Sequence, residues 1–144
     1  MSSGFDSPTL LAIKPDGRGD VTETHVAWKM TKGAPLSPSP ILVGDELYMV
    51  DDRGVASCVD AATGKQHWQE RIGGEYSASP IHAAGLIYFL DEKGGTTLVK
   101  ADKTFTKLSK NDLKGRTLAS PAPIEGALLL RTDTQLFRIE AESK

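Results

Sequence analysis

The residue types that most often carry out catalysis or bind metals are few in this chain, and their spacing matches no familiar site. The three histidines, His25, His67 and His82, do not recur at the intervals that zinc ligands adopt. No serine stands in the Gly-x-Ser-x-Gly turn that exposes a nucleophile, and no glycine-rich phosphate loop is present. The sequence therefore indicates no catalytic, cofactor-binding or metal-binding residue.

Two other features have the composition of a site and are better explained without one. Asp16 and Asp20 lie among glycines, but the segment ends before the roughly twelve residues that a calcium loop of the EF-hand kind needs. We expect a solvated turn there. Cys58 is the only cysteine and lies in an alternating run, so we interpret its thiol as buried and inert.

The bulk composition fits a soluble globular chain and excludes several functions. The 144 residues are 39% hydrophobic and 25% charged, with a formal net charge of −2. Lysine and arginine are spread along the chain, so we expect no nucleic-acid partner. No run reaches the roughly 18 apolar residues of a membrane span. Residues 1–4 do not resemble a signal peptide, and the compartment stays unassigned.

The chain is organised by a repeat of about forty residues. Ser39-Pro40 recurs as Ser79-Pro80 and as Ser120-Pro121. The same spacing separates Gly44 from Gly85 and Gly126, Tyr48 from Tyr88, and Trp28 from Trp68 and Leu108. A period near 40 with short strand-like runs inside it is typical of the blades of a β-propeller.

Each period divides into four runs with the length and apolar pattern of strands, lettered A to D from the propeller axis outward. The expected strands are Thr9–Lys14 and Val26–Lys32; Ile41–Val43, Glu46–Val50, Val55–Asp60 and Gln66–Ile72; Ile81–Ala83, Leu86–Leu90, Thr96–Lys100 and Phe105–Ser109; and Ala122–Ile124, Ala127–Arg131 and Gln135–Glu140. Residues 1–8 are expected to be irregular. The predicted fold is all-β: one partial propeller over 1–144, with antiparallel repeats at 9–32, 41–72, 81–109 and 122–140.

The clearest repeat resembles the PQQ-like (quinoprotein-type) propeller repeat. Gly44-Asp45-Glu46-Leu47-Tyr48 is followed by Asp60-Ala61-Ala62-Thr63-Gly64-Lys65-Gln66-His67-Trp68. The resemblance extends to the C-terminal part of bacterial PQQ-binding-like repeat proteins, which are often exported. It implies that Trp28 and Trp68 wedge between neighbouring blades, whereas the aromatic is lost at Leu108. Gly54 and Gly64 are expected to be structural, because each occupies a turn that needs a left-handed backbone.

The same resemblance implies a binding or scaffold role more readily than an enzyme. Quinoprotein dehydrogenases use PQQ, Ca²⁺, a catalytic carboxylate and, in many cases, an adjacent cysteine pair. This chain has one cysteine, and its only asparagine is Asn111. We therefore expect no bound PQQ and no enzymatic activity. The alternative is that the chain forms part of a PQQ-dependent oxidoreductase.

About three blade equivalents cannot close a ring, since single-chain propellers need about four to eight. We expect self-association, with two chains giving about six blades. A fragment cut from a longer propeller is a compatible alternative.

Topology places one set of loops together. In a propeller, the B–C turns and the D–A connections emerge on one face, around the axial funnel, and loops on a rigid scaffold often bind partners. The candidate residues there are Asp51, Asp52, Arg53, Tyr76, Asp91, Glu92, Lys93, Arg116, Thr132 and Asp133. One interpretation is that this face binds a protein or peptide segment, with a cation or a basic peptide favoured if the ring of charges is acidic. The alternative is that the charges are those of ordinary solvated hairpin turns.

Overall fold

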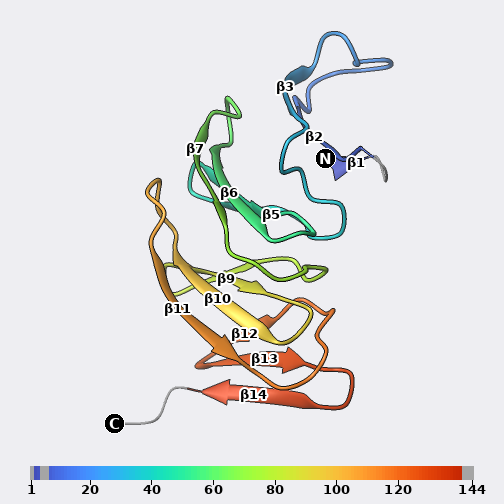
Figure 1. Cartoon of the computed structure of the whole chain (residues 1–144). Coiled ribbons are helices and arrows are strands. Elements are labelled where there is room, and N and C mark those ends of the chain that lie inside the picture. The colour runs from blue at the N-terminus through green and yellow to red at the C-terminus, as the bar shows by residue number, and fades with distance from the viewer. Residues whose placement is uncertain (1, 4–6, 141–144) are drawn as a thin grey trace.

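The computed structural model describes residues 2–3 and 7–140, and strands are the only regular elements in this part of the chain. They form four antiparallel sheets, which follow one another in chain order from β1 to β14 (Figure 1). Blade 1 contains β1 (Ser2–Ser3), β2 (Thr9–Ile13) and β3 (Val26–Met30). Blade 2 contains β4 (Ile41–Val43), β5 (Glu46–Val50), β6 (Val55–Asp60) and β7 (Gln66–Arg71). Blade 3 contains β8 (Ile81–Ala83), β9 (Leu86–Leu90), β10 (Gly95–Lys100) and β11 (Lys107–Asp112). Blade 4 contains β12 (Ala122–Ile124), β13 (Ala127–Arg131) and β14 (Leu136–Glu140).

Every sheet is a meander in which consecutive strands pair, so the predicted all-β architecture of propeller blades is confirmed. The two complete blades have the strand orders β4-β5-β6-β7 and β11-β10-β9-β8. In blade 2 the register places Tyr48 between Ile41 and Cys58. The middle strands are buried on both faces, because a neighbouring blade lies against each side.

Two expectations about the strands were wrong. Ser2–Ser3, expected to be irregular, pairs with β2, and the Ser2 hydroxyl donates a hydrogen bond to the carbonyl of Pro35 at 2.5 Å. The D strand of blade 3 runs from Lys107 to Asp112 instead of from Phe105 to Ser109. It begins later because the preceding turn closes with a hydrogen bond from Lys100 N to Thr106 O. The expected features at residues 1, 4–6 and 141–144 lie outside the described residues.

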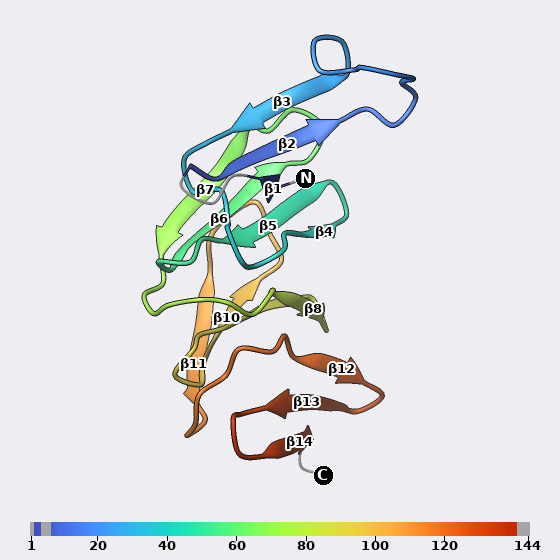
Figure 2. The ribbon, with the colours of Figure 1, turned by 90° about the vertical axis from the view of Figure 1, so that its right-hand side faces the viewer.

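The first strands of blades 2, 3 and 4 lie one below another along one side of the molecule (Figure 2). A repeated hydrogen bond links the residues that precede them. The backbone N–H of Ser39 donates to Ser79 Oγ, and that of Ser79 donates to Ser120 Oγ, both at 2.9 Å. The Ser-Pro repeat in the sequence therefore joins neighbouring blades at the start of strand A.

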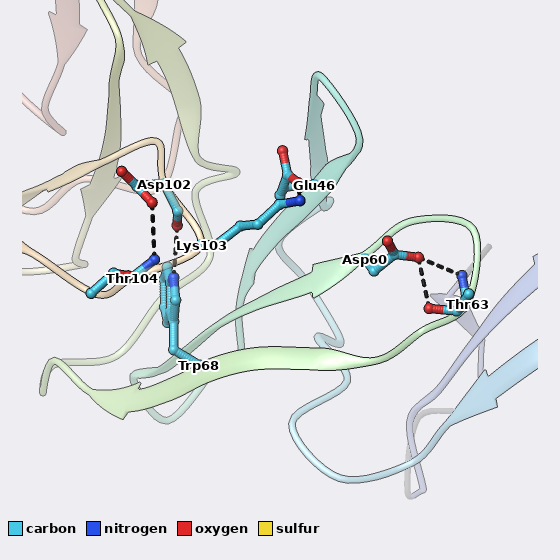
Figure 3. Close-up of polar contacts among 7 residues, drawn as sticks. All are labelled: Glu46, Asp60, Thr63, Trp68, Asp102, Lys103 and Thr104. Atoms are coloured by element: carbon cyan, nitrogen blue, oxygen red, sulfur yellow. Dashed lines mark hydrogen bonds and ion pairs between the residues drawn. The ribbon is translucent and has the colours of Figure 1, made fainter.

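Trp68 fills the seam between blades 2 and 3. Its ring is 7% exposed, and its centroid lies 5.1 Å from that of Phe105 and 6.1 Å from that of Tyr48. The indole N–H donates to the carbonyl oxygen of Asp102 at 3.0 Å, as Figure 3 shows. In the same view the Lys103 ammonium reaches Glu46 at 3.1 Å, so an ion pair also crosses the seam.

Trp28 makes the corresponding contact one blade earlier. Its indole N–H donates to the carbonyl oxygen of Ala61 at 3.0 Å. A Cβ at Gly64 would lie only 2.7 Å from the Trp28 ring, so this turn needs glycine for space as well as for its φ of 72°. At the blade 3 turn, which lacks the glycine, Phe105 packs against Trp68 instead.

The seam between blades 3 and 4 has no tryptophan. Leu108 occupies the repeat position, and 48% of its surface is exposed. An apolar groove of about 760 Å³ opens between the two blades, with Tyr88, Leu98 and Leu128 among its lining residues. The loss of the aromatic, visible in the sequence, therefore coincides with incomplete packing.

Cys58 lies in the largest buried cluster, together with Tyr48 and Trp68, and is fully buried. Burial raises the pKa of its thiol to about 11, so the side chain stays protonated near neutral pH. This agrees with the expected inert thiol.

Candidate functional site

The candidate site is the end of the blades at which the B–C turns and the D–A connections emerge. Successive strands of a meander alternate in direction, so these loops share one end, and the A–B and C–D turns share the other. We call it the B–C face. It is formed by the turns 51–54, 91–94 and 132–135 and by the connections 31–40, 72–80 and 113–121.

The first residue of each turn holds the turn together. Asp51 Oδ1 accepts hydrogen bonds from the backbone N–H groups of Arg53 and Val55, at 3.0 and 2.8 Å. Forty residues later, Asp91 Oδ1 accepts from Lys93 and Gly95, at 2.9 and 2.7 Å. Thr132 Oγ1 accepts from Gln135 N at 3.0 Å in the blade 4 turn. Each of these side chains therefore accepts hydrogen bonds from backbone N–H groups of its own turn.

Asp91 was expected on the exposed face, but it is buried, with 4% of its surface exposed. Its Oδ2 lies 3.2 Å from the Lys110 ammonium on β11. Its carbonyl oxygen accepts a hydrogen bond from the hydroxyl of Thr117, which is itself fully buried. The side chain is inside because the connection 113–121 crosses over the turn, so Asp91 cannot contact a ligand.

Replacing Asp91 with alanine is expected to destabilise the chain without removing any group that could touch a partner. The variant leaves the backbone N–H groups of Lys93 and Gly95 without their acceptor, which costs about 2–4 kcal/mol, whereas the exposed Lys110 ammonium can turn to water. Urea unfolding followed by circular dichroism measures the change. Asp133→Ala, an exposed residue of the blade 4 turn, is the control and should change stability by less than about 0.5 kcal/mol.

The second residue of each complete turn ties the turn to a D–A connection. Asp52 accepts hydrogen bonds from the N–H groups of Leu36 and Ser37, at 2.8 and 3.2 Å. Glu92 accepts from the hydroxyl of Ser77 at 2.5 Å. Both carboxylates are half-buried, so part of the acidic character expected of this face is used within the protein.

Tyr76 was also expected on the face, but only 1% of it is exposed. Its backbone N–H donates to the carbonyl of Asp52 at 3.1 Å, and the ring joins the buried cluster that contains Phe89 and Val99. Burial is the main cause that raises the pKa of the Tyr76 hydroxyl. The connection lacks strand periodicity, so its sequence gave no sign that this ring points inward.

The remaining predicted residues present exposed charges. Arg53, Lys93, Arg116 and Asp133 are exposed, and no hydrogen bond or ion pair engages these side chains within residues 7–140. The face also exposes Glu75 and Arg131, which the sequence reasoning missed because each lies at the edge of a turn or strand.

Within the described residues, a hollow lies on the face beside each of the three turns. The blade 2 hollow, of about 440 Å³, is lined by Pro8, Thr31, Gly33, Ala34, Leu36, Asp51, Asp52 and Arg53. The blade 3 hollow, of about 400 Å³, is lined by Glu75, Glu92, Lys93, Gly115 and Arg116. The blade 4 hollow, of about 170 Å³, is lined by Arg116, Leu118, Ala119, Arg131, Thr132 and Asp133.

Within the described residues, no three histidine, cysteine or acidic side chains are grouped so that they could hold a metal ion. The same part of the chain contains no helix long and apolar enough to cross a membrane.

Comparison with known proteins finds a protein family whose sequence model matches most of the chain. The family model described as "Outer membrane protein assembly factor BamB" matches residues 18–142. The chain is 31% identical to the outer membrane protein assembly factor BamB of Burkholderia pseudomallei (strain K96243) over 137 residues. That match covers 93% of this chain and 34% of the relative, so the chain spans about a third of the relative's length.

Solved structures with the same fold include proteins of different function. The BamB of Moraxella catarrhalis superimposes with a TM-score of 0.66 at 15% identity, covering 94% of this chain and 40% of that one. The glutaminyl cyclase of Myxococcus xanthus gives 0.56 at 13% identity, covering 92% and 57%. A europium-containing methanol dehydrogenase gives 0.53 at 13% identity, covering 81% and 22%. At these identities the likeness shows the fold alone.

Proposed function

Because the chain belongs to the PQQ-like β-propeller family of the outer membrane protein assembly factor BamB, we propose that it is a non-catalytic module that binds a protein partner through the B–C face. The proposal is supported by a difference between two sets of polar side chains. The side chains that hold turns and seams together form hydrogen bonds or ion pairs within the protein. In contrast, four cationic residues that line the hollows of the B–C face have no side-chain partner in residues 7–140: Arg53, Lys93, Arg116 and Arg131.

Exposed arginine side chains around hollows suit protein recognition. Arginine is enriched in interfaces because its planar fork pairs with carboxylates and stacks on flat groups. The hollows sit between loops that the blades hold rigidly, so a partner meets a preformed surface. The similar BamB proteins are named as assembly factors, which agrees with a binding role.

The proposal is tested by capture of a partner on the immobilised chain. The double variant Arg53→Glu/Lys93→Glu reverses two exposed charges of the B–C face, and Lys65→Glu/Lys107→Glu reverses two exposed charges outside it. We expect the first variant to lose a partner that the unaltered chain captures and the second to keep it. Equal capture by both variants would count against the B–C face.

An oxidoreductase is the alternative function, since a methanol dehydrogenase shares the fold. The residues do not fit it well: Cys58 is alone and buried, and the described residues lack a cluster of metal ligands. We therefore propose no enzymatic activity and no bound PQQ. Dye-linked oxidation of alcohols after incubation with PQQ and Ca²⁺ separates the two, and turnover above a heat-treated control would establish the enzyme.

We further propose that the chain self-associates, so that two copies supply about six blades. The support is exposed apolar surface at blade 4, where Leu136 is 69% and Ile139 is 42% exposed, and where β14 has no outer neighbour in the described sheet. An unpaired strand edge favours pairing with another strand. The alternative to self-association is that further blades of a longer chain pair with this strand edge. A stable monomer in light scattering at micromolar concentration would contradict self-association.

A further inference from the structure

The charges that remain free on the B–C face differ from those suggested by its composition. Its acidic residues favour a cation or a basic peptide, but Asp51, Asp52, Asp91 and Glu92 already accept hydrogen bonds from the protein. The exposed cations make no such contact with residues 7–140. The exposed cations of the face therefore remain available to an incoming molecule.

The balance of charge changes from blade to blade. The lining residues of the blade 2 hollow include two aspartates and one arginine. Those of the blade 3 hollow include two glutamates, a lysine and an arginine, and those of the blade 4 hollow include two arginines and one aspartate. The formal charge of the lining residues runs from −1 at blade 2 through 0 at blade 3 to +1 at blade 4. Cationic character is thus concentrated at blade 4.

We propose that the blade 4 hollow binds an acidic side chain of a protein partner, with the carboxylate between Arg116 and Arg131. This rests on the proposed function and specifies the chemistry of the partner. Arg116 comes from the connection 113–121 and Arg131 from the end of β13, so two separate elements each contribute an arginine to the lining of one hollow. Arginine binds carboxylates through paired N–H donors in a fixed geometry.

The other lining groups limit what fits. The hollow, of about 170 Å³, is large enough for one short side chain and too small for a folded element. Leu118 and Ala119 form an apolar wall, which suits the methylene groups of an aspartate or glutamate. Asp133 opposes binding because its carboxylate lies in the same lining and has no side-chain partner in the described residues. Its removal should therefore strengthen the interaction.

The test is fluorescence anisotropy with a labelled tetraglutamate peptide, and with tetraglutamine and tetralysine peptides as comparisons. Binding is measured in low salt, where exposed charges interact most strongly, and again at high salt. Tetraglutamate should bind most tightly. Arg116→Gln/Arg131→Gln should weaken it about tenfold, and Asp133→Asn should strengthen it about threefold, the order expected for partly exposed ion pairs.

Arg18→Gln removes an exposed arginine in the loop 14–25, away from the face, and is the matched control. It should leave tetraglutamate binding unchanged. The inference is overturned if tetraglutamate binds no better than tetraglutamine, or if Arg18→Gln weakens binding as much as the double variant. If the peptide fails while Arg53→Glu/Lys93→Glu still abolishes partner capture, the proposed function survives and only the acidic specificity is lost.

Discussion

Replacing Trp68 with alanine is expected to lower the free energy of unfolding by about 3–5 kcal/mol, the usual cost of truncating a large buried aromatic. The ring is 7% exposed and lies between Tyr48 and Phe105, so its removal opens a cavity across the seam of the two complete blades. It also removes the indole donor to Asp102. Urea unfolding followed by far-ultraviolet circular dichroism measures the loss independently of tryptophan fluorescence.

Trp28→Ala is the matched control, because it removes the same side chain from the same repeat position. Trp28 is only half-buried and lies at the edge of the molecule, so we expect a loss of about 1–3 kcal/mol. Equal losses for the two variants, or a loss below about 1 kcal/mol for Trp68, would contradict the idea that the central seam dominates stability.

Replacing Gly94 with alanine is expected to cost about 2–4 kcal/mol, because strain and overlap act together. Its φ is 90°, where residues with a side chain are rarely found. An added Cβ would overlap the carbonyl oxygen of Leu113, a backbone atom at the start of the next connection, so the turn or the connection must move. Thermal and urea unfolding measure the loss.

Gly85→Ala separates the two causes. Gly85 has a φ of 74°, but an added Cβ meets no atom within 4 Å. We expect only the backbone cost of about 1–2 kcal/mol there. If both alanine variants lose the same stability, the close approach of the connection 113–121 to the blade 3 turn has no energetic importance.

The architecture was predictable because the repeat lies in residues that bond to the backbone or pack at seams. The same structural role recurs once in each blade for the Ser-Pro pairs, for the turn glycines, and for Trp28 and Trp68. Their spacing in the sequence therefore indicates the order of strands and blades. Where the period was broken, prediction weakened. The missing turn glycine gave no sign that Phe105 would pack against Trp68 and move the following strand to Lys107.

The candidate site was harder to predict because charge type does not reveal whether a side chain is free. Asp91 and Arg116 are both charged loop residues, yet one is buried beneath a connection and the other is exposed over two hollows. Tyr76 faces the core for the same reason: the path of a connection is set by tertiary contacts and leaves no periodic pattern. Arg131 was missed because it is the exposed last residue of a strand whose other residues are buried or half-buried.

Site-specific photocrosslinking can show whether the B–C face binds a protein partner. A photoreactive amino acid is placed at Arg53 or Lys93 on this face, and at Lys65 or Glu125 on the opposite turns, in the cells that produce the chain. All four positions are exposed, so folding should be unaffected. We expect a discrete crosslinked partner from Arg53 and Lys93 only. Crosslinks of equal yield from both ends of the blades, or from Lys65 and Glu125 alone, would contradict it.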